Sequence, residues 1–407
     1  MTKPYPSQPM KVPLLDLKPQ YDEIASEVRA AIERVCESQH FILGAEVKAL
    51  EERIARYSGS RHAIGVSSGT DALLLALMAL EIGRGDEVIT SPFTFFATGG
   101  TIARAGARPL FCDIDPETFN LSPARVAEFI ERHCEARVEG NSGGLVNRAT
   151  GGHVKAIMPV HLYGQLCDME PLMQIARRHG LKVIEDAAQS LGARDGERRM
   201  AGSIGDIGCY SFFPTKNLGA FGDAGMCVTS DGALAERMEI LRVHGAKPKY
   251  YHTYIGGNFR LDEIQAAVLN VKLEYLDDWS KLRQLNAHIY TEALAQAFPH
   301  GGPIAPHVRG ANHHVFNQYV IRAPRRDELR AFLTAAGIGS EIYYPVPLHL
   351  QRCFGYLGHR EGELPEAERA TREVLALPVY PELSEPQLKY VVATMAGFYA
   401  AATQLPE

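Results

Sequence analysis

Lys216 offers the most distinctive chemistry in this sequence, because it lies in the segment SFFPTKNLGAFGDAG (211–225), two residues after Pro214 and just before several glycines. The segment follows a short apolar run that is typical of a buried strand. A lysine amine becomes a nucleophile when desolvation lowers its pKa, and it can then form a Schiff base with a carbonyl compound. Most lysines are solvated surface residues, however. Ser211 either adds a hydroxyl group to an anion site or is an ordinary strand-end serine.

Gly69-Thr70-Asp71 is a second candidate, because it stands where the run HAIGVSS (62–68) changes into a helical pattern. The free N–H groups and the positive dipole end of a helix start can bind a phosphate group. An ordinary helix N-cap explains the same residues, and for this motif alone it is the more common explanation.

Glu185-Asp186 is the third candidate, because it ends the buried run KVIEDA (182–187). Ligands of α/β proteins bind at the carboxyl ends of such strands. An aspartate at this place either holds a protonated heterocyclic nitrogen or caps the next helix, and the motif alone favours neither.

Other common catalytic motifs are absent from the sequence. It contains no GK[ST] and no G-x-G-x-x-G after a strand, so neither a P-loop nor a Rossmann dinucleotide site is indicated. His313 and His314 are adjacent and lack the spacing of zinc ligands, so no metal site is predicted.

The elements that must position these residues alternate between strands and helices. Short apolar runs without strict alternation indicate strands that are covered by helices on both faces. Seven such runs predict an α/β protein around a largely parallel sheet. The predicted strands are 62–68, 86–91, 108–114, 154–162, 182–187, 207–213 and 225–230.

Segments outside this pattern suggest how the chain is organised. Residues 1–20 contain several prolines and are expected to wrap the surface, and Val47, Leu50, Ile54 and Tyr57 have the spacing of an amphipathic helix. The stretch EGNSGGLVNRATGG (139–152) is glycine-rich and is interpreted as a surface insertion or flap. A long helical pattern (260–285) then leads into a smaller α+β segment. We therefore predict a large domain over 1–275 and a small domain over 276–407.

Length and composition exclude several classes of protein. The 407 residues are 46% hydrophobic and 22% charged, which is typical of a globular chain of two to three domains. A net charge of −6 without a basic block argues against nucleic-acid binding. The longest apolar run, Ala72–Leu80, is far too short to span a membrane. Prolines near the N-terminus disfavour a signal peptide, and seven cysteines without a CxxC motif indicate reduced thiols and a cytoplasmic location.

Eight motifs in a fixed order resemble the DegT/DnrJ/EryC1/StrS family of pyridoxal-phosphate (PLP) sugar aminotransferases. Each motif alone is weak, but eight in register are highly specific, and the match runs from about residue 12 to residue 395. The resemblance implies the fold type I, aspartate-aminotransferase-like architecture. The motifs are GTDA (69–72), SPFTFFAT (91–98), DIDP (113–116), PVHLYGQ (159–165), EDAAQS (185–190), SFFPTKNLG (211–219), NFRLDEIQAA (258–267) and YYPVPLHLQ (343–351).

The resemblance implies PLP as the cofactor and assigns roles to individual residues. Lys216 matches the lysine that bonds covalently to PLP, and Asp186 matches the carboxylate that keeps the pyridine nitrogen protonated. Gln189 matches an amide beside the ring hydroxyl, and Phe95 matches the aromatic residue that stacks on the ring. The residues implied to bind the phosphate group are Gly69, Thr70, Ser211 and, from the partner subunit, Asn258.

The same resemblance implies that Arg260, Tyr343 and Tyr344 bind the nucleotide-sugar. It implies a largely structural role for His161 and Tyr163. Many relatives carry His-Tyr where this chain has Tyr343-Tyr344, which leaves the sugar preference open. The insertion at 139–152 is longer than is usual in the family and has no assigned role.

The implied reaction transfers an amino group from an amino acid, usually L-glutamate, to a UDP- or dTDP-linked 3- or 4-keto sugar in amino-sugar or polysaccharide biosynthesis. YYPVPLHLQ and FNQY are most similar to the 3-amino branch, which favours a UDP-linked 3-keto sugar. Two alternatives are a PLP-dependent sugar dehydratase, in which histidine replaces the lysine, and a non-catalytic regulatory protein. The presence of Lys216 argues against both. The implied assembly is a homodimer with shared active sites.

Overall fold

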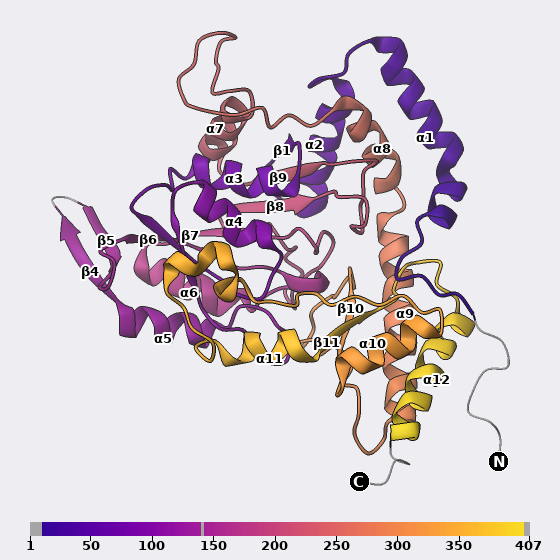
Figure 1. Ribbon diagram of the computed structural model, residues 1–407. Helices are drawn as coiled ribbons and strands as arrows, with labels where there is room; N and C mark the ends of the chain where they lie inside the picture. Colours follow the sequence, from indigo (N-terminus) through magenta and orange to yellow (C-terminus); the bar gives the residue numbers. More distant parts are fainter. Residues whose placement is uncertain (1–9, 140–141, 403–407) are drawn as a thin grey trace.

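A large sheet forms the centre of the protein in the computed structural model, which describes residues 10–139 and 142–402 (Figure 1). The strand at Gly225–Thr229 runs antiparallel to both of its neighbours, whereas the other six predicted strands run in one direction. The seven predicted strands and the largely parallel α/β sheet are therefore confirmed. The strand order is β1 (His62–Val66), β9 (Gly225–Thr229), β8 (Ile207–Ser211), β7 (Lys182–Asp186), β6 (His153–Met158), β2 (Asp86–Thr90) and β3 (Arg108–Phe111).

Helices cover both faces of the sheet and enclose two hydrophobic cores. Val183 belongs to one core and its neighbour Ile184 to the other, because successive strand side chains point to opposite faces. The first core includes residues of α2 (Ala45–Ser58), α5 (Pro123–His133), α6 (Met169–His179) and α8 (Glu263–Leu273). The second includes residues of α3 (Gly69–Ala79), α4 (Phe96–Arg104) and α7 (Gly232–Arg242). The helix predicted from Val47 to Tyr57 is thus α2.

The helical pattern predicted over 260–285 is wrong as one helix. Helix α8 ends at Leu273 and α9 (Leu276–Ala297) begins three residues later. The two helices serve different cores: α8 packs on the large sheet through Leu269, whereas α9 contributes Tyr290 to a third core. Periodicity predicts helical conformation, but it does not reveal this division between cores.

The third core lies in the C-terminal part of the chain and also includes an N-terminal residue. Val12 is fully buried there and pairs with Ile338, so the expectation that residues 1–20 only wrap the surface is wrong at this position. Residues 1–9 lie outside the described chain. The division at 275/276 stays a prediction. The elements of this part are β10 (Tyr319–Arg322), α10 (Arg326–Ala335), α11 (Pro365–Glu373), β11 (Val374–Leu377) and α12 (Glu385–Ala402).

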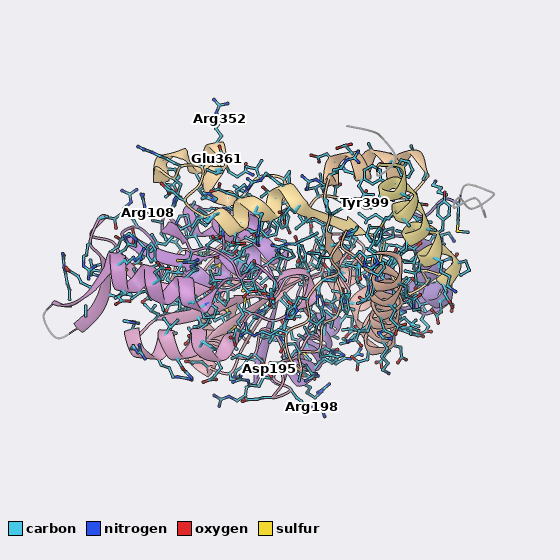
Figure 2. All side chains as sticks on the ribbon, turned by 90° about the horizontal axis from the view of Figure 1, so that it is seen from below. Arg108, Asp195, Arg198, Arg352, Glu361 and Tyr399 are labelled. Atoms are coloured by element: carbon cyan, nitrogen blue, oxygen red, sulfur yellow. The ribbon has the colours of Figure 1, made fainter. Side chains whose placement is uncertain are left out.

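Two segments that lie outside the alternation of strands and helices pack against the elements around the large sheet. Helix α1 (Lys18–Ser38) packs along α8 through Ile24 and Val28 (Figure 1). The short helices η2 (Leu348–Leu350) and η3 (Arg352–Leu357) reach the other edge, where Arg108 of β3 donates a 3.3 Å hydrogen bond to the carbonyl of Leu357. Figure 2 shows Arg108 on the same side of the molecule as Arg352.

The glycine-rich stretch 139–152 is more ordered than a surface flap. Strands β4 (Cys134–Glu139) and β5 (Ser142–Asn147) form a hairpin, and β5 also pairs with β6. Leu145 is buried, and the buried carboxylate of Glu87 accepts hydrogen bonds from Asn147 and Thr150 at 2.9 and 2.7 Å. The interpretation as a flap is wrong for this part because these polar contacts anchor the stretch, although residues 140–141 lie outside the description. None of the described helices is long and apolar enough to cross a membrane.

Candidate active site

Several predicted residues meet at one edge of the large sheet. Asp186 ends β7, Ser211 ends β8, and Gly69 begins the helix that follows β1. Gly69 and Ser211 lie so close that a Cβ atom at residue 69 would be 2.5 Å from the Cβ of Ser211. Only glycine therefore fits at this position unless the backbone moves.

The start of α3 is capped by a side chain and leaves backbone N–H groups without an acceptor. The N-cap is Ser68, whose hydroxyl accepts a 3.0 Å hydrogen bond from the N–H of Asp71. The N–H groups of Gly69 and Thr70, in the first turn, have no acceptor within the helix. The structure thus confirms the helix cap, and Ser211 at the end of its strand lies against the same turn. Anion binding at this helix start stays a prediction.

Asp186 is a buried carboxylate with donors on both of its oxygens. Thr98 donates to Oδ2 at 2.7 Å, and the N–H of Ala188 donates to Oδ1 at 3.2 Å. Thr94 lies 3.1 Å from the Thr98 hydroxyl and completes a short chain of hydroxyl groups. Burial raises the pKa of Asp186, while these hydrogen bonds and the charge of Lys216 lower it in part. Such a carboxylate favours a cationic partner.

Lys216 has an amine whose pKa is lower than that of an exposed lysine. Burial lowers its pKa to about 8, and the attraction of Asp186 offsets this decrease in part. Its segment is held by buried contacts on both sides. The amide of Asn317 donates to Asn217 Oδ1 at 2.8 Å, and Lys272 Nζ donates to the carbonyl of Gly219 at 2.5 Å.

Aromatic residues and one amide form a group beside Asp186. Gln189 Oε1 accepts a 2.7 Å hydrogen bond from the N–H of Tyr163, which fixes the orientation of the amide. Its Nε2 therefore faces the hydroxyl of Tyr344 at 3.2 Å. The rings of Phe95 and Tyr344 lie 6.3 Å apart, and 59% of Phe95 is exposed. The Tyr163 hydroxyl donates to the carbonyl of Tyr343, which ties this pair of tyrosines to the sheet.

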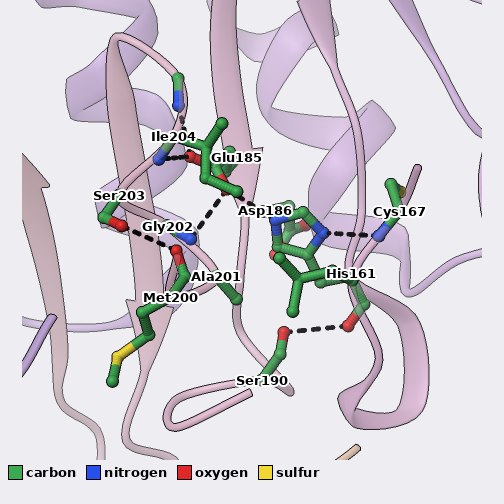
Figure 3. Close-up of polar contacts among 12 residues, drawn as sticks. His161, Cys167, Glu185, Asp186, Ser190, Met200, Ala201, Gly202, Ser203 and Ile204 are labelled. Carbon is green, nitrogen blue, oxygen red and sulfur yellow. Dashed lines mark hydrogen bonds and ion pairs between the residues drawn. The ribbon is translucent and has the colours of Figure 1, made fainter. Parts of the chain in front are cut away.

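The carboxylate of Glu185 is surrounded by hydrogen-bond donors of the protein itself, which distinguishes it from its neighbour Asp186 (Figure 3). His161 Nδ1 accepts a hydrogen bond from the N–H of Cys167 at 3.0 Å, so its Nε2 carries the hydrogen and donates to Glu185 at 2.7 Å. Three further donors to Glu185, at 2.6 to 2.8 Å, are the N–H groups of Gly202, Ile204 and Gly205. All of these contacts are internal, so Asp186 rather than Glu185 is the candidate carboxylate for binding a ligand.

Asn258 and Arg260 lie in a segment beside β1, where Arg260 pairs with Val66. The carbonyl of Phe259, between them, accepts a 3.0 Å hydrogen bond from the N–H of Ser67, and the side chain of Asn258 is exposed. Arg260 Nε is buried without a hydrogen-bond partner in the described structure. No described side-chain hydrogen bond joins Asn258 or Arg260 to Lys216.

Sequence reasoning missed Thr98, Asn217 and Asn317. Thr98 falls within the motif SPFTFFAT, but only the fold places its hydroxyl on Asp186, 88 residues away. Asn217 lies within SFFPTKNLG and Asn317 within FNQY, and no spacing in the sequence indicates that they pair. Among the described residues, no group of three or more His, Cys, Asp or Glu side chains is arranged to hold a metal ion.

Comparison with known proteins identifies the family of the chain. The model of the DegT/DnrJ/EryC1/StrS aminotransferase family matches residues 22–396. The chain is 52% identical to the pleiotropic regulatory protein of Geobacillus stearothermophilus, over 96% of this chain and 99% of that protein. It is 40% identical to UDP-N-acetyl-3-dehydro-alpha-D-glucosamine 3-aminotransferase of Acidithiobacillus ferrooxidans, over 96% and 98%. It is 42% identical to dTDP-3-amino-3,4,6-trideoxy-alpha-D-glucose transaminase of Streptomyces venezuelae, over 94% of each chain.

A solved structure confirms the fold. The model superposes on DesV of Streptomyces venezuelae, solved in complex with a ketimine intermediate, with a TM-score of 0.87 and 39% identity. The match covers 98% of this chain and 100% of that chain, so the expected fold type I architecture is present throughout. The chain belongs to the DegT/DnrJ/EryC1/StrS aminotransferase family.

Proposed function

We propose that this aminotransferase uses PLP to transfer the amino group of an amino acid, L-glutamate in the first instance, to the 3-keto group of a nucleotide-linked sugar. The observation that supports the sugar position is that two relatives at 40 and 42% identity are named for amino groups at carbon 3 of a sugar. Their nucleotides differ, one being UDP and the other dTDP, so the two names agree on the position of the amino group in the sugar but not on the nucleotide of the acceptor.

The residues at the sheet edge fit PLP at each of its functional ends. The crowded turn of Gly69 and Ser211, with Thr70, would hold the phosphate group at a helix start. The buried carboxylate of Asp186 would pair with the ring nitrogen, and the Lys216 amine would attach to the aldehyde carbon. When bound, PLP supplies an electron sink for the bond that is broken at the amino-acid α-carbon.

Side chains of this chain would then bind, orient and move protons. Because burial lowers the pKa of Lys216 to about 8, more of its free amine is neutral than in an exposed lysine, and the neutral amine can accept the proton of the donor α-carbon. Thr98 stabilises the ionised form of Asp186 through its hydrogen bond, and the carboxylate would hold a proton on the ring nitrogen. Phe95, which is largely exposed at this edge, would cover the ring face, and Gln189 would approach the ring hydroxyl through Nε2.

We further propose a cytoplasmic homodimer with shared active sites, in which Asn258 reaches the phosphate group of the neighbouring subunit. The support is an exposed set of large apolar side chains near this residue, including Ile255, which is 93% exposed, and Tyr250, which is 78% exposed. Burial of such residues against a second copy is favourable. Mixing Lys216→Ala and Asn258→Glu chains would test the sharing: rescued turnover supports it, and no rescue after confirmed subunit exchange contradicts it.

The substrate proposal is tested by single-turnover assays with matched sugars. The purified enzyme is converted to its amino form with L-glutamate and mixed with UDP- or dTDP-linked 3-keto and 4-keto hexoses, and the product is identified by mass spectrometry and NMR. Amination at carbon 3 is the expected result. Amination only at carbon 4, or none with either nucleotide, would contradict the proposal.

A regulatory function is the second candidate, because the relative that is 52% identical is named a pleiotropic regulatory protein. The dehydratase alternative has less support, since Lys216 occupies the position that histidine takes in that branch. Absorbance separates the candidates: a protein without an absorbance band of lysine-bound PLP and without turnover would favour regulation. A regulatory effect that is lost in Lys216→Ala would instead indicate that the regulation depends on catalysis.

A further inference from the structure

A partly open pocket lies behind the segment that carries Lys216. Its volume is about 130 Å³, and it is enclosed by α1, α8 and the segment that includes Pro214 and Ala220. Figure 1 shows α1 running alongside α8 in this region. Lys216 itself does not line the pocket, which therefore differs from the candidate active site.

Lys272 places a buried ammonium group at this pocket. Only 5% of the residue is exposed, and one of its N–H groups is used by the carbonyl of Gly219 at 2.5 Å. No acidic side chain of the described chain lies within ion-pair distance of it. Glu382 acts on it from farther away, and burial lowers the pKa of Lys272 to about 8. A buried cation without a close anion is costly, so an anionic ligand at this place would be stabilising.

Gln20 supplies an independent observation. This residue of α1 lines the same pocket and is only 7% exposed, yet its amide takes part in no hydrogen bond within the described chain. The polar atoms of this amide are not sealed from solvent, so they are accessible from the open pocket. Lys272 and Gln20 together offer an ammonium and an amide N–H, which is a donor set for the two oxygens of a carboxylate.

The rest of the pocket is apolar and limits the size of a ligand. Tyr21 and Phe221 contribute aromatic surface, and the Lys272 ammonium lies 5.8 Å from the ring centre of Phe221. An engineered cavity of about 150 Å³ in another protein holds one benzene molecule, so the enclosed part of this pocket holds about five or six non-hydrogen atoms, and a slightly larger ligand extends through its open side.

We propose that this pocket is a second ligand site, which binds a small carboxylate with a short branched aliphatic body. The carboxylate contacts Lys272 and Gln20, and the aliphatic part packs between the aromatic walls. Because Pro214 and Ala220 line the pocket and flank Lys216, a ligand at this place lies directly behind the catalytic segment. The proposal does not depend on the identity of the sugar substrate.

Calorimetric titration of the full-length protein with 3-methylbutanoate tests the site, with 3-methylbutanamide as the uncharged isostere. A dissociation constant on the order of 1 mM is expected for seven non-hydrogen atoms, with one site per chain. The amide is expected to bind at least about tenfold more weakly, because it cannot form the charged contact. Absence of saturable carboxylate binding, or equal binding of the amide, would overturn the proposal.

Substitutions of the pocket residues test whether the carboxylate binds there. Lys272→Met keeps the length of the side chain and is expected to weaken carboxylate binding about tenfold or more, and Gln20→Leu several-fold. Lys281→Met is the matched control, because that lysine lies on the exposed surface of α9, where it pairs with Asp278 at 2.7 Å. Equal weakening in the control would refute the assignment. If Lys272→Met fails to fold, Gln20→Leu decides, and unchanged affinity in that variant overturns the proposal. So would a crystal structure in which a partner's side chain fills the pocket.

Discussion

Replacing Thr98 with valine perturbs the ionisation of Asp186 without altering the carboxylate itself. Thr98 is fully buried and donates a 2.7 Å hydrogen bond to Asp186 Oδ2. A hydrogen bond to the ionised form lowers a carboxyl pKa, and its loss therefore raises the pKa of Asp186, which burial has already raised. A hydrogen bond to a charged group contributes about 1.5–3 kcal/mol, and about 1.4 kcal/mol corresponds to one pKa unit, so the expected shift is about one to two units.

The sign of this shift determines what the assay should show. Because ionised Asp186 is the proposed active form, activity is lost as the pH falls through its pKa. A higher pKa moves the acidic limb of the kcat profile to higher pH by about one to two units, while kcat on the alkaline side of the profile changes little. The measurement is kcat for complete transamination with L-glutamate as the amino donor, as a function of pH and with saturating PLP.

Thr101→Val provides the matched control for this prediction. Thr101 is on the same helix and 1% exposed, but its hydroxyl donates to the backbone carbonyl of Thr98 at 3.2 Å rather than to Asp186. The control should leave the acidic limb in place, even if it lowers thermal stability. If both variants give the same pH profile, Thr98 does not tune Asp186 and the reasoning fails.

Four further changes test the site and its support. Lys216→Ala should abolish transamination, and borohydride reduction of the PLP-loaded enzyme should label Lys216; a label on another lysine would exclude its role. Asp186→Asn should lower kcat far more than PLP affinity, since an amide hydrogen-bonds but does not stabilise a protonated ring nitrogen, and near-normal kcat would contradict this role. Gly69→Ala should weaken PLP binding to the apoprotein at least about tenfold, because its Cβ would lie 2.5 Å from that of Ser211; unchanged affinity in a fluorescence titration would remove Gly69 from the phosphate site. Glu185→Leu should destabilise the apoprotein by about 3 kcal/mol or more in urea unfolding, since it leaves four N–H donors unpaired, two of them buried and two partly buried, and a loss below about 1 kcal/mol would contradict its structural role.

The hairpin at 139–152 could not be predicted from the local sequence pattern. Glycines and polar residues in EGNSGGLVNRATGG indicate a loop, but Leu145 is buried and Asn147 and Thr150 bind Glu87. Glu87 lies about 60 residues earlier, on β2, and becomes their partner only when β2 and β6 pair. Contacts of this kind depend on strand order, which no local window of sequence contains.

The alternation of apolar runs and helical patterns determined the seven sheet strands, because buried strands and amphipathic helices have distinct periods. The order of eight short motifs likewise determined the family and the candidate residues Lys216 and Asp186. Tertiary structure alone decided that Glu185 faces internal donors while Asp186 faces the site, because neighbouring strand residues point to opposite faces and only the packed sheet shows what lies on each. It also decided that Thr98 supports Asp186 and that Gln20 and Lys272 share a pocket, since these pairs are far apart in the chain and meet only when the helices pack.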